Sequence, residues 1–348
     1  MIFDYTRKRP QPLSSVKQRR EYAVHKNKKQ SFRVILLFIV LIAGIALSLW
    51  LLFRQARWNG EEQLTLILAS PSSTGNELLH SIQILVVRPK ESTALLFPLP
   101  ENLYIDVLKG YGLYKSSALF GLAEMEKLSE QFVRQSLAMS LGIDIQETIL
   151  EQKSMKLESM GATRSLVMRS LIMQNRSTLQ FIERYRLWRV LSKLRQDQLS
   201  MIDPFSSSLF LPIAAVGDGQ ALGLDVLRFD ALAFKLFANP SLRKEQISVT
   251  IVNTTYTTGM ATKVARALSS MGVDIVHISS LAPPVPKTTL YIASQEVARS
   301  ATAGTIQRTL NIDSSSFEQH TQKTEEFRAD IVIFLGEDMV KLFGEKQE

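Results

Sequence analysis

The residues best suited to chemistry are the hydroxyl side chains of a threonine-rich segment between a predicted strand and a predicted helix. This candidate anion-binding loop consists of Thr254, Thr255, Thr257, Thr258 and Gly259. At a helix N-terminus, free backbone N–H groups and the helix dipole favour an anion such as a glycan phosphate. Simple capping explains the same residue types, because threonine caps helices and glycine eases a turn. The segment lacks G-K-[ST], so it is not a nucleotide P-loop.

The histidines and serines give no sign of a catalytic or metal site. The four histidines are His25, His80, His277 and His320, and they have neither H-x-x-H nor H-E-x-x-H spacing. Structural histidines therefore account for them better than a zinc site does. The serine run 206–208 lacks the G-x-S-x-G pattern of a nucleophile elbow. We predict no catalytic residues, no metal ligands and no cofactor from these residues.

A basic segment in the middle of the chain has a helical pattern. Its basic residues are Arg184, Arg186, Arg189, Lys193 and Arg195, and Tyr185, Leu187, Trp188 and Leu191 lie between them. Such a surface suits anionic glycopolymer or lipid head groups. A solvated amphipathic face, with arginines paired to Glu183 and Asp197, explains the same pattern and is the preferred interpretation.

An uninterrupted apolar run at residues 34–53 lies between Arg33 and Arg54 and contains neither a charge nor a proline. As a helix rising about 1.5 Å per residue, it matches the roughly 30 Å hydrocarbon core of a bilayer. We predict a single transmembrane helix here. A cleaved signal peptide is the alternative, but the run exceeds a normal h-region and no clear A-x-A site follows it.

The flanking charges predict the orientation of this helix. Residues 1–33 carry ten Lys/Arg against two acids, and the rest of the chain carries 31 of each charge. The positive-inside bias places the basic tail in the cytoplasm and the bulk of the chain outside, at the cell membrane. The net charge of +8 therefore reflects the tail. It indicates membrane lipid as a partner and argues against nucleic acid.

Beyond the span, two β-rich blocks flank the helical middle. The absence of cysteine in an exported chain favours a bacterial envelope protein. Strands are predicted at 64–69, 82–87 and 94–97, where apolar runs are cut by Pro, Gly and Ser. Apolar residues from Leu122 to Leu141 recur at helical spacing and predict one helix that stops at Gly142. We predict an α/β sandwich over residues 60–240.

The C-terminal block predicts a small α/β domain over residues 245–340. Strands are expected at 247–252, 273–278, 288–292 and 330–335, and helices at 260–271 and 295–310. The order β-α-β-β-α-β is that of a split βαβ domain, with one layer of helices on a sheet. The predicted fold class is therefore α/β throughout.

The motifs of this block resemble those of the LytR C-terminal domain. Residues 248–261 are similar to its V-x-V-x-N-G-T...G-x-A opening, with Thr254 in place of the usual glycine. Residues 288–291 and 329–336 are similar to its T-x-I-Y and A-D-V-x-V-x-L-G strands. That domain commonly follows a membrane span and a LytR-CpsA-Psr catalytic domain. Residues 80–86 and 94–104 resemble the latter's D-T-I-M-L-V-S and V-T-L-L-S-I-P-R-D-T-Y strands.

This resemblance implies transfer of lipid-linked glycopolymers onto the cell wall, with arginines binding pyrophosphate and carboxylates holding Mg²⁺. The chain departs from the family at those residues. The P-R-D motif is Pro100-Glu101-Asn102, the strand aspartate falls on His80, and G-S-D-S-R corresponds to residues 69–73 without an acid or arginine. The later D-x-x-R-x-x-R-Q pattern is at best Thr178, Phe181 and Arg184-Tyr185. A carboxylate at Glu101 would repel pyrophosphate.

We therefore expect a degenerate LytR-CpsA-Psr-like domain, a pseudoenzyme that binds or organises cell-wall glycopolymer assembly. Its candidate partners are membrane lipid, cell-wall glycopolymer and envelope proteins. The alternative is a divergent phosphotransferase that attaches lipid-linked glycopolymers, for which Mg²⁺ would be the cofactor. A transcriptional attenuator is suggested only by the historical name of the family, and the exported topology argues against it.

Overall fold

The computed structural model describes residues 38–42, 44, 58–72, 78–152, 159–172, 176–205, 208–214, 220–281 and 283–344. The chain forms two compact units, Met1–Arg57 and Trp58–Glu348. In the first unit, residues 38–42 and 44 are helical. Among the described residues, no helix is both long and apolar enough to cross a membrane. The predicted basic tail and most of the predicted span at 34–53 lie outside the described residues.

The N-terminal sheet of the second unit has six strands in the order β7-β6-β1-β2-β3-β8. They are β1 (Leu64–Pro71), β2 (His80–Arg88), β3 (Thr93–Pro98), β6 (Glu147–Leu150), β7 (Arg176–Ser177) and β8 (Leu199–Met201). The three predicted strands are confirmed as β1, β2 and β3. Antiparallel pairing joins β1 to β2 and β2 to β3, whereas β1 and β6 are parallel.

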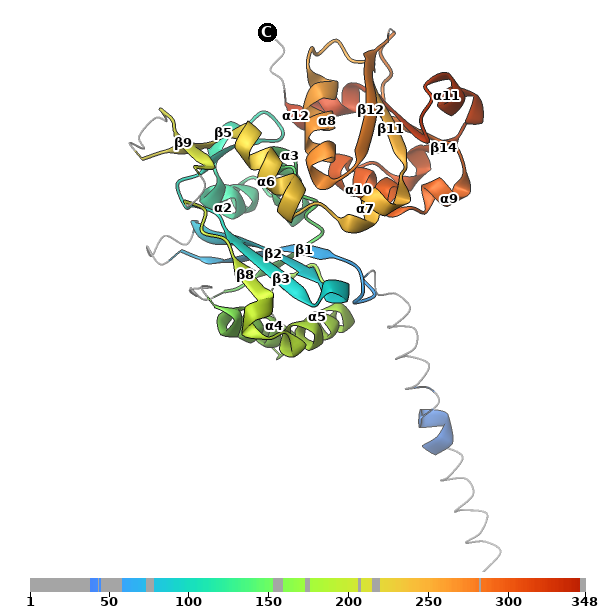
Figure 1. Ribbon diagram of the computed structural model, residues 1–348. Helices are drawn as coiled ribbons and strands as arrows, with labels where there is room; N and C mark the ends of the chain where they lie inside the picture. The colour runs from blue at the N-terminus through green and yellow to red at the C-terminus, as the bar shows by residue number, and fades with distance from the viewer. Residues whose placement is uncertain are drawn as a thin grey trace, which may run out of the picture. The chain divides into compact units, whose positions relative to one another are not determined.

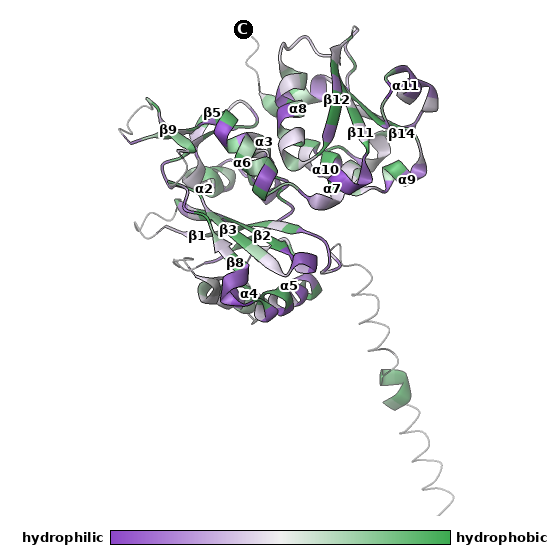
Figure 2. Ribbon diagram, viewed as in Figure 1, coloured by the Kyte–Doolittle hydropathy of each residue, from purple (hydrophilic) through white to green (hydrophobic). Residues whose placement is uncertain are grey.

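Helices cover both faces of the N-terminal sheet (Figure 1). They are α2 (Leu119–Met125), α3 (Glu130–Leu141), α4 (Met160–Ile172) and α5 (Phe181–Lys193). Because side chains alternate along a strand, Leu66 and Leu68 join the apolar cluster under α4 and α5, whereas Ile67 and Ala69 join the cluster under α2 and α3. The central strands are accordingly hydrophobic along most of their length (Figure 2).

The single helix predicted from Leu122 to Leu141 is wrong in one respect, because α2 and α3 are separate. Lys127 adopts a left-handed backbone (φ 52°), and Ser129 is extended at the start of α3. The chain therefore turns between the helices although the apolar spacing continues across the break. The predicted stop at Gly142 is confirmed, since Gly142 follows α3 with φ 62°.

Smaller elements connect the N-terminal sheet to the rest of the unit. They are the 3-10 turns η1 (Pro89–Glu91), η2 (Ser116–Ala118) and η3 (Gln196–Gln198), the hairpin β4 (Tyr104–Val107) and β5 (Gly112–Lys115), the hairpin β9 (Phe210–Pro212) and β10 (Leu222–Leu224), and α6 (Val226–Leu236). Leu103 bridges to Leu222, which places the two hairpins side by side.

The C-terminal sheet has five strands in the order β12-β11-β15-β13-β14. Its elements are α7 (Pro240–Glu245), β11 (Ser248–Asn253), α8 (Met260–Met271), β12 (Asp274–Ser280), β13 (Thr289–Ile292), α9 (Gln295–Ala298), α10 (Ala301–Leu310), η4 (Ser314–Ser316), β14 (Phe317–Gln319), α11 (Thr321–Glu326), β15 (Ile331–Leu335) and α12 (Glu337–Phe343). The four predicted strands are confirmed, and the helix predicted at 295–310 is interrupted between α9 and α10.

The split βαβ prediction is wrong for this sheet. In a split unit another strand separates the two strands joined by the helix, but β11 pairs directly with β12 in parallel. The most apolar strand, β15, takes the central place between β11 and β13, and four of its five residues are buried. The mixed α/β class is as predicted. The helix layer is not single, because α11 packs on β13 and β15 beside a second small cluster around Val332.

The two sheets belong to one compact unit. One continuous apolar cluster includes Ile67 of the N-terminal sheet and Ile331 of the C-terminal sheet. Arg266 of α8 donates to the carbonyls of Met139 and Ser140 at the end of α3, at 3.0 and 2.9 Å. The division into domains at 60–240 and 245–340 stays a prediction. We expect residues 58–348 to fold without the first unit, since the unit contains these clusters within itself.

Candidate functional site

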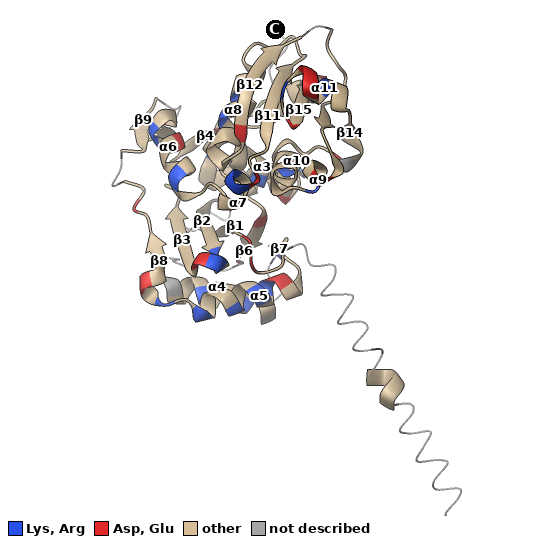
Figure 3. Ribbon diagram, turned by 45° about the vertical axis from the view of Figure 1, so that its right-hand side comes forward, with Lys and Arg blue, Asp and Glu red and all other residues tan. Residues whose placement is uncertain are grey.

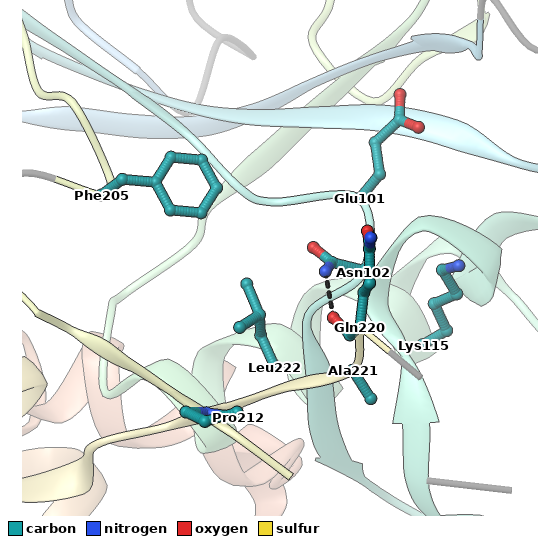
Figure 4. Close-up of a pocket in the computed structure, with 8 residues that line it drawn as sticks. All are labelled: Glu101, Asn102, Lys115, Phe205, Pro212, Gln220, Ala221 and Leu222. Carbon is teal, nitrogen blue, oxygen red and sulfur yellow. Dashed lines mark hydrogen bonds between the residues drawn. The ribbon is translucent and has the colours of Figure 1, made fainter. Parts of the chain in front are cut away.

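A cavity of about 630 Å³ lies where β3 leaves the N-terminal sheet. The residues that line it are Glu101, Asn102, Lys115, Phe205, Pro212, Gln220, Ala221 and Leu222. We call this cavity the Glu101 pocket. Figure 4 shows the Phe205 ring on one side of it and Glu101, Asn102 and Lys115 on the other. Among the described residues that line the pocket, Lys115 is the only base and Glu101 the only acid.

A tight turn after β3 positions Glu101. The N–H of Leu103 donates to the carbonyl of Pro100 at 3.1 Å and closes the turn. The hydroxyl of Ser117 donates to the carbonyl of Glu101 at 2.7 Å. The hydroxyl of Ser72, just beyond β1, donates to the Glu101 carboxylate at 3.1 Å. The structure thus brings the departing Glu101 together with a serine of the segment that corresponds to G-S-D-S-R.

Asn102 joins this turn to the β9–β10 hairpin. Its side-chain amide donates to the carbonyl of Gln220, and its backbone carbonyl accepts from the N–H of Leu222 at 3.0 Å. The two contacts hold segments more than a hundred residues apart in the sequence. The Asn102 amide therefore holds the wall of the pocket together, and the Glu101 carboxylate is the charged acceptor beside it.

His80, another position at which the sequence departs from the family motifs, lies at the start of β2 but does not line the pocket. It pairs with Pro71 across the sheet, and its buried ring lies 5.4 Å from that of Phe120. Burial lowers the pKa of the His80 imidazole, and a backbone hydrogen bond with Leu78 and the charge of Glu124 only partly oppose this. Among the described residues, no group is a hydrogen-bond partner of Nδ1. The arrangement is that of a neutral structural histidine.

His80 should make stability depend on pH. Because its folded-state pKa is lowered, His80 binds a proton more readily in the unfolded chain. The contribution of neutral His80 to the free energy of unfolding is therefore fully present above about pH 6.5, and it is lost as pH falls towards the lowered pKa. We expect the melting temperature of residues 58–348 to fall less between about pH 8 and about pH 5 in His80→Gln than in the parent. His277→Gln, at an exposed site on β12, is the control. An identical pH dependence in all three proteins would contradict this role.

The positions of the later family pattern lie away from the Glu101 pocket. The hydroxyl of Thr178 accepts from the N–H of Thr148 at 2.8 Å. Arg184 donates to the carbonyl of Ser170 in α4, and burial lowers its pKa. Phe181 is exposed on α5. None of these three is among the described residues that line the pocket.

The candidate anion-binding loop lies between β11 and α8, as predicted. Gly259 precedes α8 with φ 83°. The hydroxyl of Thr254 donates to the carbonyl of Leu335 at 2.7 Å, and that of Thr255 donates to Asn253 Oδ1, also at 2.7 Å. Thr257 is half-buried and Thr258 is exposed. Anion binding by Thr254, Thr255, Thr257, Thr258 and Gly259 stays a prediction.

Asn253 organises this loop and was not singled out from the sequence. Its side-chain oxygen accepts from the N–H of Thr255 at 3.0 Å, and its side-chain amide donates to the carbonyl of Thr257 at 2.9 Å. An asparagine at a strand end, followed by threonines, is a typical start of such a side-chain-bonded turn. That signal was available in the sequence.

A second cavity, of about 450 Å³, lies between the two sheets' helices and hairpins. Apolar residues of β4, β10 and α12 line it, including Ile105, Leu224 and Phe343, and Arg266 lines it as well. Arg266 also meets Asp230 at 3.2 Å. Burial raises the pKa of Asp230, although the Arg266 charge opposes the shift. Sequence reasoning missed this cavity because its walls come from five separate segments of the chain.

Comparison with known protein families finds a match in the C-terminal part of the chain. Residues 246–338 match the model of the family described as LytR cell envelope-related transcriptional attenuator. No curated protein matches the chain by sequence.

Solved structures similar to the chain are remote. A LytR-CPS2A-psr family protein (TagT) with bound octaprenyl pyrophosphate lipid is 10% identical, with 50% of this chain and 88% of that chain covered and a TM-score of 0.36. TagV of B. subtilis is 9% identical, with coverage of 49% and 94% and a TM-score of 0.35. A transcriptional regulator of Enterococcus faecalis is 10% identical, with coverage of 61% and 89% and a TM-score of 0.36. At these TM-scores the N-terminal part is interpreted from its own residues.

Proposed function

We propose that this chain, whose residues 246–338 form a C-terminal domain of the LytR cell envelope-related transcriptional attenuator family, is a bacterial envelope protein that binds or organises cell-wall glycopolymers without transferase turnover. A single membrane span at 34–53 would anchor it, with residues 1–33 in the cytoplasm and the bulk of the chain outside. Its partners would be membrane lipid together with cell-wall glycopolymer or other envelope proteins.

The composition of the Glu101 pocket carries this proposal. Where the resembling family has an arginine followed by an acid, this pocket has a carboxylate followed by an amide. Arginine forks suit pyrophosphate because they donate two hydrogen bonds and a positive charge. Glu101 offers a negative charge instead, and Ser72 is hydrogen-bonded to it at 3.1 Å. A pocket built in this way disfavours the reacting group of the transferase substrate.

The same pocket suits the sugar part of a glycopolymer better than its phosphate. Carboxylate oxygens accept hydrogen bonds from hydroxyl groups, which sugars supply in number. The Phe205 ring, largely exposed across the pocket, offers an apolar face beside them. Ligand sites typically combine such an apolar surface with a few polar groups that fix orientation.

Calorimetric titration of residues 58–348 tests the proposal. We expect a soluble amino-sugar disaccharide to bind and inorganic pyrophosphate not to bind, with or without Mg²⁺. Glu101→Gln should weaken disaccharide binding by about tenfold, which is the loss of one charged hydrogen bond. Glu91→Gln, at an exposed glutamate in η1, is the matched control and should change nothing. Mg²⁺-dependent pyrophosphate binding would contradict the proposal.

The alternative is a divergent phosphotransferase that attaches lipid-linked glycopolymers to the wall through residues outside the family motifs. The resemblance of residues 94–104 to a catalytic-domain strand favours this alternative. Transfer from a polyprenyl-pyrophosphate glycan by the purified full-length chain with Mg²⁺ would establish it and overturn the non-catalytic reading. No transfer, together with disaccharide binding, would leave the binding function.

A further inference from the structure

We infer that the outward face of α5 docks on the lipid head groups of the membrane that anchors the chain and binds anionic lipid there. This inference rests on the proposed membrane anchor. The face, which we call the α5 surface, consists of Phe181, Tyr185, Trp188, Arg189, Ser192 and Lys193.

Helical periodicity separates the α5 surface from the core. Residues three and four apart lie on the same side of a helix. Leu187 and Leu191 are buried against the N-terminal sheet, and Ile182 is buried as well. Phe181 and Tyr185, by contrast, are 60% and 43% exposed on the outer side. The ring of Tyr185 lies 6.0 Å from that of Trp188, so three aromatic side chains share this surface.

The charge of the α5 surface is basic. Arg189 and Lys193 are exposed on it, and Figure 3 shows basic residues along the outer side of α4 and α5. Glu183 does not neutralise them as the sequence suggested, because its buried carboxylate accepts the N–H groups of Trp58 and Gln180 at 2.9 and 2.8 Å. The pairing expected for Asp197 is confirmed with Arg195 at 3.3 Å.

Aromatic and basic side chains together are typical of a helix that lies in a membrane interface. Tyrosine and tryptophan are enriched at the level of the lipid head groups, and Lys and Arg attract anionic lipids. Exposed Phe181 and Tyr185 rings beside Arg189 are not expected on a surface that contacts only water. This combination favours lipid over a soluble anionic polymer as the occupant.

The length of the chain places α5 within reach of the bilayer. The described part of the folded unit begins at Trp58, whose N–H is bonded to Glu183 and whose carbonyl accepts from Arg186 at 2.5 Å. The predicted span ends only five residues earlier, at Phe53. Five residues reach at most about 18 Å even when fully extended. The helix that holds Trp58 therefore cannot lie far from the surface from which an anchored chain emerges.

A label on α5 tests the inference in the full-length chain. The sequence contains no cysteine, so Ser192→Cys introduces a unique site for a spin label. In liposomes with anionic lipid, we expect a water-soluble nickel relaxant to reach this label at least about threefold less than a label at Tyr256→Cys. Tyr256 is 85% exposed in the C-terminal part and is not on α5. Liposomes of neutral lipid alone should give weaker protection.

Variants of the labelled chain separate docking from accidental shielding. Phe181→Ser with Tyr185→Ser, or Arg189→Glu, should restore relaxant access at position 192. Leu227→Ser removes an exposed apolar side chain on α6 and should leave access unchanged. Access at 192 that falls only after a soluble poly(glycerol phosphate) is added would show that the surface binds polymer, and the lipid inference would be overturned.

An alkaline carbonate wash distinguishes the two proposals. Release of the chain from the liposomes by the wash would contradict the proposed membrane anchor, and the docking inference that rests on the anchor would fall with it. An anchored chain whose label at 192 is as accessible as the one at 256 overturns docking alone. An anchored chain with protection at 192, lost in the α5 variants, supports both.

Discussion

Gly142→Ala should lower the free energy of unfolding of residues 58–348 by about 3 kcal/mol. Gly142 has φ 62°, a left-handed conformation that costs an alanine about 1 kcal/mol or more. In addition, a Cβ added there would lie 2.5 Å from Cβ of Ser270 on α8. Both atoms are fixed to backbone, so relief requires α3 and α8 to separate. Urea denaturation followed by circular dichroism measures the loss.

Gly112→Ala is a matched control, because Gly112 has φ 63° and nothing lies within 4 Å of an added Cβ. It should cost only the backbone term, about 1 kcal/mol. The difference between the two variants isolates the contact between α3 and α8. Gly142→Ala combined with Ser270→Gly should lower the free energy of unfolding by less than the sum of the losses in the two single variants. Equal losses for Gly142→Ala and Gly112→Ala would show that α3 and α8 are not in close contact.

Asp144→Ala should cost about 2 kcal/mol of stability. The Asp144 side chain is 7% exposed and lies 2.8 Å from Nη2 of Arg308. It also accepts the Thr305 hydroxyl at 3.1 Å. Burial tends to lower the pKa of Arg308, but the charge and hydrogen bonds of Asp144, together with the charges of Glu147 and Glu62, outweigh this and the pKa is raised. Because Arg308 is 44% exposed, water screens part of the lost attraction, and the cost stays below that of a fully buried pair.

Asp106→Ala is the control for this pair. Asp106 meets Lys263 at 4.0 Å, and both side chains are largely exposed. Exposed ion pairs contribute little, so the loss should stay below about 0.5 kcal/mol. Urea denaturation followed by circular dichroism measures the loss of stability in both variants. A cost for Asp144→Ala as small as that for Asp106→Ala would mean that Asp144 and Arg308 do not fasten α10 to the N-terminal part.

The local elements of this fold were predictable from the sequence, because they depend on neighbours in the chain. The apolar run of β15 and the period of α8 both follow from spacing, and Gly142 marked the end of α3. The order of strands in the C-terminal sheet was not predictable in the same way. The central place in the sheet goes to the strand that buries both of its faces. Whether β13 or β15 takes that place becomes clear only when both strands are considered within the whole sheet.

The two candidate sites also differ in how far the sequence predicts them. The loop at Thr254 is continuous in sequence and lies where it was expected. The Glu101 pocket depends on Asn102 meeting Gln220, a contact between residues 118 apart. No local pattern specifies such a contact. The resemblance did mark Glu101 and the segment that holds Ser72, but no motif pointed to the Phe205 ring across the pocket.

The central place of β15 has a consequence for the order of events during folding. β11 and β13 each hydrogen-bond to β15 rather than to one another. Until residues 331–335 have left the ribosome and any export channel, both strands expose unpaired edges, which are prone to associate with other chains. Such late, long-range pairing also slows folding. The C-terminal sheet should therefore close only after residues 331–335 have been synthesised, and a chain that lacks β15 would be a target for chaperones and proteases.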